Sequence, residues 1–147
     1  MTHLTEHFTL EEMIFSDTAI RRNILNNPSE KEIANLKALC ENVLEPLRLT
    51  LGKPIRINSG YRSPELNLAI GGVPTSQHML GEAVDTTVVG MSINEYFQAI
   101  KDFVALGGIE PDQIIREYSN WVHISYRKGF NRKQFLKIDH GTGYQPA

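Results

Sequence analysis

The chain has 147 residues, of which 41% are hydrophobic and 22% charged, and its formal net charge is -2. These values are typical of one globular domain with a core, and they argue against a strongly basic nucleic-acid-binding module. Cys40 is the only cysteine, so no internal disulfide can form, and its apolar helical setting predicts a buried side chain. We expect a single domain over residues 1–147, with its core at about 8–138 and a loose tail over 139–147.

The N-terminal stretch "MTHLTEHFTLEEM" is polar and acidic, and it lacks the basic start and apolar run of a secretory signal peptide. No apolar run in the chain approaches the roughly 18 residues that a membrane-spanning helix needs. We therefore expect a protein that is cytoplasmic as synthesised, with no membrane span and no export by the usual route.

Four segments open with a capping residue and continue as helices. In three of them a Ser or Thr is followed three residues later by Glu, which is the pattern of a capping box. In the fourth, Ser63 precedes Pro64, and proline suits the first helical position. The predicted helices begin at about Leu10, run over 30–48, run from Ser63 to Gly71-Gly72, and run from Ser92 to Gly107-Gly108.

Four short segments predict strands, because they alternate apolar and polar residues or are rich in β-branched ones. The last two flank Ser119-Asn120, which suits a hairpin turn and so favours antiparallel pairing. We predict an α+β fold in which helices flank a small antiparallel sheet. The predicted strands are "PIRINSG" (54–60), "EAVDTTVV" (82–89), "QIIREY" (113–118) and "WVHISY" (121–126).

Strand alternation indicates where the polar side chains of two strands lie. In "WVHISY" the alternate apolar residues predict the core face, so His123 lies on the opposite face, toward a cleft. Asp85 lies in "EAVDTTVV" and can meet His123 if the two strands are neighbours in the sheet. His78 lies just upstream, in a loop that Gly81 allows to turn sharply back over the strand.

Two imidazoles and one carboxylate form a three-ligand set suited to zinc, and an open fourth position is typical of catalytic sites. Taken singly, each residue has a more ordinary explanation: His78 as chance spacing, Asp85 as a strand-end carboxylate and His123 as a hydrogen-bonded sheet histidine. A carboxylate within "AVDTTVV" nevertheless needs a partner, because burying an unpaired charge costs much free energy.

Three stretches, "INSGYRS" (57–63), "SQHMLGEAVD" (76–85) and "EYSNWVHIS" (117–125), together resemble the zinc D-Ala-D-Ala carboxypeptidases and related peptidoglycan peptidases. The fold of that family is shared with lysostaphin-type peptidases and the hedgehog signalling domain. The family pattern S-x-H-x-x-G-x-A-x-D, followed later by a histidine, is matched at Ser76, His78, Gly81, Ala83 and Asp85, and then at His123. The resemblance covers roughly residues 8–126 and implies that His78, Asp85 and His123 bind one zinc ion.

The resemblance also implies a catalytic carboxylate shortly before the last histidine. Many members carry it three residues before that histidine, but this residue is Asn120 here, and an amide cannot act as a base. Glu117 lies six residues before His123, an offset found in some members, and we assign it the role of catalytic base. The alternative is an exposed strand glutamate. Trp121 stands where the family often has a second histidine, and it is expected to form an apolar wall of the substrate cleft or to pack in the core.

Arg62 in "SGYRS" matches the arginine that family members use for substrate. A guanidinium can hold a carboxylate through two hydrogen bonds and can stabilise charge that develops on a carbonyl oxygen. Ser76 is expected to hydrogen-bond the substrate or to steady the loop. Both have local alternatives, a capping or surface arginine and a turn contact. His3, His7 and His140 are expected to be solvated.

The resemblance implies zinc-dependent hydrolysis of a peptide bond in the stem peptides of bacterial peptidoglycan, by a carboxypeptidase or by an endopeptidase such as a phage endolysin. Two other functions stay open: a zinc-containing module that binds the cell wall without cleaving it, and a structural part of a phage particle. The expected partner is the stem peptide, with no nucleic acid, and we expect a monomer. Action on the wall would follow release from the cytoplasm or carriage by a phage particle.

Overall fold

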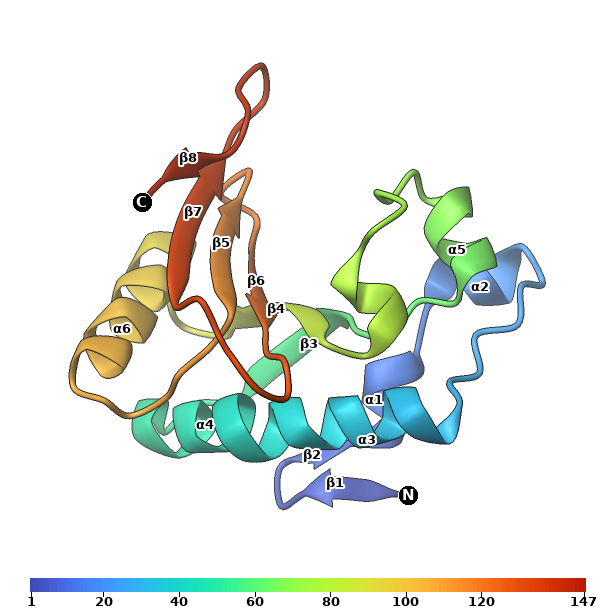
Figure 1. Cartoon of the computed structure of the whole chain (residues 1–147), viewed down its shortest axis with the longest axis horizontal. Helices are drawn as coiled ribbons and strands as arrows, with labels where there is room; N and C mark the ends of the chain where they lie inside the picture. The colour runs from blue at the N-terminus through green and yellow to red at the C-terminus, as the bar shows by residue number, and fades with distance from the viewer.

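A six-stranded sheet with the order β3-β4-β6-β5-β7-β8 forms the centre of the fold in the computed structural model, which describes residues 1–147 (Figure 1). The sheet and the helices around it confirm the predicted α+β class. All four predicted strands are present, together with two that were not predicted. The six are β3 (Ile55–Ser59), β4 (Ala83–Val88), β5 (Gln113–Glu117), β6 (Trp121–Ser125), β7 (Gln134–Ile138) and β8 (Gln145–Pro146).

The sheet is not wholly antiparallel as predicted, because β5 and β7 pair in parallel. β6 already pairs with β4 on one edge and with β5 on the other, and β7 joins the sheet at the outer edge of β5. β6 runs away from the β5–β6 hairpin, and β7 then runs back along β5, as Figure 1 shows.

The long helical segment that crosses beneath the sheet in Figure 1 corresponds to the helix predicted over 30–48, but it contains a π-helical turn. Pro46 has no N–H to donate to the carbonyl of residue 42, so the regular hydrogen-bond ladder is interrupted there and the turn widens. The segment continues to Leu51 and ends at Gly52, whose φ is 64°.

Each predicted helix start is confirmed by a capping residue in the structure. Three further features, α2, η2 and the small sheet of β1 and β2, were not predicted from the sequence. No helix combines the length and the apolar composition that crossing a bilayer requires. The helices are α1 (Leu10–Ile14), α2 (Asp17–Arg21), α3 (Glu30–Leu39), π-helical η1 (Cys40–Leu44), α4 (Glu45–Leu51), α5 (Pro64–Ala69), 3₁₀-helical η2 (Gln77–Leu80) and α6 (Ile93–Ala105); β1 is His3–Thr5 and β2 is Phe8–Thr9.

The C-terminal segment 139–147 is not the loose tail that the sequence suggested. β8 adds to the outer edge of β7, and the Ala147 N–H donates to the Phe135 carbonyl at 3.0 Å. Gly141, with φ 81°, helps the chain reverse direction before β8. The pairing covers part of an edge that β7 would otherwise leave open. A two-residue strand that contains a proline is too short to show alternation, so no local pattern indicates it.

The core lies between the sheet and the helices α3, α4 and α6. Val122 and Ile124 are fully buried on its sheet side, as the alternation of β6 predicts. Thr86 is the polar exception on that face, and its hydroxyl donates to the Val122 carbonyl at 2.9 Å and pairs with the Tyr96 hydroxyl at 2.7 Å. Cys40 is buried as predicted, and burial raises the pKa of its thiol. The alternate side chains of β6, including His123, lie on the opposite face of the sheet, away from this core.

Candidate metal centre and cleft

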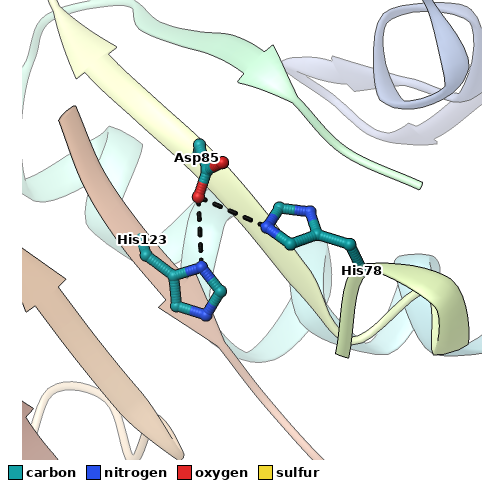
Figure 2. Close-up of side chains that lie close together, drawn as sticks. All are labelled: His78, Asp85 and His123. Carbon is teal, nitrogen blue, oxygen red and sulfur yellow. Dashed lines mark hydrogen bonds and ion pairs between the residues drawn. The ribbon is translucent and has the colours of Figure 1, made fainter. Parts of the chain in front are cut away.

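His78, Asp85 and His123 come together on the face of the sheet opposite the core (Figure 2). Asp85 and His123 are directly paired across β4 and β6, and η2 carries His78 over them. Asp85 Oδ1 lies 3.1 Å from His123 Nδ1 and 3.3 Å from His78 Nε2. The fold therefore brings together the three residues that the sequence singled out as metal ligands.

The spacing of these three atoms fits a tetrahedral metal ion. Bonds of about 2.0–2.1 Å at tetrahedral angles place neighbouring ligand atoms about 3.3 Å apart. Here one donor atom of each residue lies within 4.8 Å of the other two, and no fourth His, Cys, Asp or Glu belongs to the group. The residues thus fit an ion with three protein ligands and one coordination position open to other molecules.

The hydrogen bonds of the two imidazoles indicate which nitrogen each presents. His78 Nδ1 lies 2.8 Å from the Gly60 carbonyl, which can only accept, so Nδ1 carries the proton and Nε2 offers a lone pair toward Asp85. Such a partner on the far nitrogen is typical of histidines that bind metals. His123 presents Nδ1 on the same side, beside the same carboxylate oxygen.

Asp85 and His123 shift each other's pKa values. Burial alone would raise the pKa of Asp85, but the charges and hydrogen bonds of His78 and His123 hold it well below its usual range. Burial alone would lower the pKa of His123, but the hydrogen bond and charge of Asp85, with a contribution from Glu117, raise it. The buried carboxylate is therefore ionised, as a metal ligand must be.

Arg62 lies beside the cluster and donates a hydrogen bond to the other oxygen of the Asp85 carboxylate. Its Nη2 donates to Asp85 Oδ2 at 3.3 Å, its Nη1 to Asn67 Oδ1 at 3.3 Å and its Nε to Ser59 Oγ at 3.2 Å. A guanidinium has five N–H donors, so two remain without a protein partner. Burial lowers the pKa of Arg62, while Asp85 and Glu117 act in the opposite direction.

The loop that carries Arg62 also braces the helix that carries His78. The Arg62 N–H donates to the His78 carbonyl at 3.1 Å, and the Tyr61 N–H donates to the Met13 carbonyl at 2.7 Å. Ser76 caps η2, since its Oγ accepts from the His78 N–H at 3.2 Å. This bond is of the kind expected if Ser76 steadies the loop, and a contact of Ser76 with substrate stays a prediction.

Two buried asparagines that the sequence analysis missed fix the same region. Asn26 donates to the carbonyls of Ile14 and Tyr61 and accepts from the Ser63 N–H, which ties three segments together. Asn67 accepts from Arg62 and donates to the Val73 carbonyl. Their partners are distant in sequence, or lie in an irregular loop, so no local pattern marks them.

Gly81 allows η2 to lie close against α3. Its φ is +72°, and a Cβ added there would lie 2.4 Å from the Glu32 carbonyl oxygen. We expect Gly81→Ala to lower the free energy of unfolding by more than the roughly 1–2 kcal/mol that a left-handed non-glycine residue costs, because the backbone contact adds to that cost. Urea unfolding of the metal-free protein measures the loss.

Gly107→Ala is the matched control for this substitution. Gly107 has a similar φ of +78°, and nothing lies within 4 Å of its added Cβ. The Gly107→Ala protein should therefore lose only the roughly 1–2 kcal/mol that a left-handed non-glycine residue costs. Equal losses in the two variants would show that the contact between η2 and α3 is not tight.

All seven residues that the sequence singled out line one open cleft of about 1140 Å³. The cleft lies over the outer face of β5 and β6 and is bounded on its other side by the segment from Ile70 to Leu80. The cleft residues predicted from the sequence are Arg62, Ser76, His78, Asp85, Glu117, Trp121 and His123.

Glu117 and Trp121 face each other across the β5–β6 hairpin. They are a direct cross-strand pair, and Trp121 Nε1 donates to Glu117 Oε1 at 2.6 Å. His123 is two residues further along the same face of β6, so Glu117 is its diagonal neighbour, with Cα atoms about 7–8 Å apart. The indole therefore holds a carboxylate beside the candidate metal centre, a contact that the sequence analysis did not predict.

Aromatic side chains extend this end of the cleft. Tyr118 packs edge-on against Trp121 and stacks on His140, whose ring centroid is 4.6 Å away. Tyr144, from the supposed tail, also lines the cleft. His3, His7 and His140 are exposed as predicted, although His7 also hydrogen-bonds Glu45 at 2.6 Å and none of the three belongs to the metal cluster.

The comparison with known families agrees with this arrangement. The sequence profile of the family described as Peptidase M15 matches residues 6–125, which include all seven predicted site residues. No curated protein matches the chain closely enough to suggest a more specific activity.

Proposed function

We propose that this chain, which belongs to the peptidase M15 family, hydrolyses a peptide bond in the stem peptides of bacterial peptidoglycan with one zinc ion held by His78, Asp85 and His123. The observation that carries the proposal is the convergence of these three side chains in a cleft that also contains Glu117. The family supports a peptidase. The donor set, two imidazoles and one carboxylate with an open fourth position, supports a catalytic zinc ion.

Zinc bound there would polarise the carbonyl of a peptide and lower the pKa of a water molecule that attacks it. Glu117 would accept a proton from the attacking water and pass it to the nitrogen of the leaving amine. The hydrogen bond from Trp121 keeps the Glu117 carboxylate oriented for both steps. No other carboxylate lies on that part of the cleft beside His123, apart from the candidate ligand Asp85.

Arg62 and Ser76 contribute polar groups that can meet the substrate. Arg62 keeps two N–H donors free of protein partners, and these can stabilise negative charge on the scissile carbonyl oxygen or hold a substrate carboxylate. Ser76 uses its oxygen as an acceptor for the His78 N–H, so its own O–H remains available to donate. Both residues line the cleft.

Digestion of purified peptidoglycan tests the proposal. The zinc-loaded protein should release new peptide ends, a chelator should stop the release, and added zinc should restore it. Mass analysis of the fragments identifies the bond and separates removal of a terminal D-Ala from cleavage inside the stem. If peptidoglycans of several chemistries yield no new peptide ends while zinc is confirmed in the protein, the proposal is contradicted.

We expect Trp121→Phe to reduce kcat by about 10-fold or more while KM and zinc content change little. Phenylalanine keeps the ring but removes the N–H that holds Glu117, and a hydrogen bond to a charged group is worth about 1.5–3 kcal/mol. Steady-state kinetics on a soluble stem peptide, with metal analysis of the same sample, measures the effect. A rise in KM with unchanged kcat would instead assign Trp121 to substrate binding alone.

A further inference from the structure

Arg127 lies on the cleft face at the end of β6 that is remote from Glu117. Alternation along β6 puts it on the same face as Trp121 and His123, since the pairing of β6 with β4 continues through the bond from the Tyr126 N–H to the Glu82 carbonyl. It lines the same cleft, and its side chain remains 41% exposed. It lies outside residues 6–125, so the family match assigns it no role.

The loop after β6 holds Arg127 in place. The Arg127 N–H donates to Asn131 Oδ1 at 2.8 Å, and Asn131 Nδ2 donates back to the Arg127 carbonyl at 2.8 Å. Arg132, further along the loop, grips the fully buried Asp112 through its Nε at 3.0 Å and its Nη2 at 2.8 Å. These bonds order the loop before any ligand arrives, which reduces the entropy lost on binding.

The guanidinium of Arg127 is left without a hydrogen-bond partner of its own. Its Nε is buried without an acceptor, and its only charged neighbour is Asp112 Oδ2 at 3.5 Å. The Asp112 carboxylate already pairs with Arg132. Burial alone would raise the pKa of Asp112, but the hydrogen bonds and charge of Arg132, together with the charge of Arg127, lower it to about 2. Glu82, an acid that lines the cleft, accepts from Gln77 Nε2 at 3.3 Å and makes no ion pair with Arg127.

We propose that Arg127 is a subsite for a carboxylate of the substrate, held through the planar fork of its guanidinium. The proposal rests on the peptidoglycan peptidase function above. Arg127 lies four positions beyond His123, or about 13 Å along an extended chain. An extended peptide covers that distance in about four residues, so the carboxylate belongs to a stem-peptide residue within about four positions of the cleaved bond. Arginine suits this role because its paired donors match a carboxylate.

Synthetic stem peptides test the subsite. In each peptide of the set, a different free carboxylate is converted to an amide. For the wild-type protein, amidation of one particular carboxylate should lower kcat/KM roughly tenfold or more. Arg127→Gln should show the same loss on the unmodified peptide and no further loss on the amidated one. Lys128→Gln is the control, because it removes the same charge from the same loop at an exposed residue that does not line the cleft.

Binding separates this inference from the proposed activity. The same peptides are titrated into zinc-loaded Glu117→Gln and into the double variant Glu117→Gln/Arg127→Gln, where no cleavage is needed. A roughly tenfold weaker affinity of the double variant, found only for peptides that carry the recognised carboxylate, supports the subsite even if no peptide is cleaved. Wild-type protein that is indifferent to every amidation, or equal affinities of the two variants, would overturn it.

Discussion

Glu117→Gln is expected to abolish peptidoglycan cleavage while leaving the fold and the zinc content unchanged. Glutamine has nearly the same shape and its amide oxygen can still accept the hydrogen bond from Trp121 Nε1, so the β5–β6 hairpin should keep its geometry. The amide cannot take a proton from the attacking water. Loss of a general base costs about 10²- to 10⁴-fold in rate, and a fall in kcat of that size is the expected result.

Fragment release per unit time, measured with equal zinc occupancy, checks this expectation. Glu110→Gln is the matched control, since Glu110 is exposed and does not line the cleft, and its activity should equal that of the wild-type protein. Glu117→Gln that keeps a tenth or more of the wild-type rate would remove Glu117 from the mechanism. A wild-type protein that holds zinc but cleaves nothing would favour the non-catalytic wall-binding module.

The second large effect is expected for His78→Ala, which should weaken zinc binding by more than 100-fold. Loss of groups that only support a ligand already costs about 10- to 100-fold in metal affinity, and His78 supplies a ligand atom. In the wild-type protein, zinc at about 100 times its dissociation constant should add about 2.7 kcal/mol to the free energy of unfolding. The variant should gain almost none of it.

Thermal unfolding with and without zinc, together with a competition titration against a chelator, measures both quantities. His3→Ala serves as the control because His3 is exposed and lies outside the cluster. It also removes a histidine that could bind metal adventitiously near the N-terminus. A His78→Ala protein that keeps the stabilisation and the affinity of the wild type would place the metal elsewhere.

The cluster could be predicted from the sequence because its residues match the pattern of the peptidase family that the chain resembles, and because strand alternation can be judged locally. The spacing of "SQHMLGEAVD" and the alternation of β4 and β6 put Asp85 and His123 on one face, and the observed pairing joins them directly. Glu117 and Trp121 were predicted separately, but the hydrogen bond between them depends on the three-residue reversal at 118–120. Both Tyr118 and Ser119 have positive φ in this reversal, and neither residue type predicts that conformation.

The parts that escaped prediction depend on contacts between distant residues. Tyr144 lines the cleft in a fold where β7 adds to β5 and β8 adds to β7, and no short pattern specifies that choice of edge. Asn26 and Asp112 lie in loops and carry no local pattern, because their hydrogen-bond partners, Tyr61 and Arg132, are distant in sequence. Arg127 is different, because the alternation that places His123 on the cleft face extends past the predicted strand to this residue.

The most direct test of the central claim is a crystal structure of the zinc-loaded protein with anomalous diffraction recorded at the zinc edge. We predict one strong peak about 2.0–2.2 Å from His78 Nε2, His123 Nδ1 and an oxygen of Asp85, with no further protein atom bound. A peak away from these three residues, or a fourth protein side chain that completes the coordination, would contradict the assignment of a catalytic metal centre to this cleft.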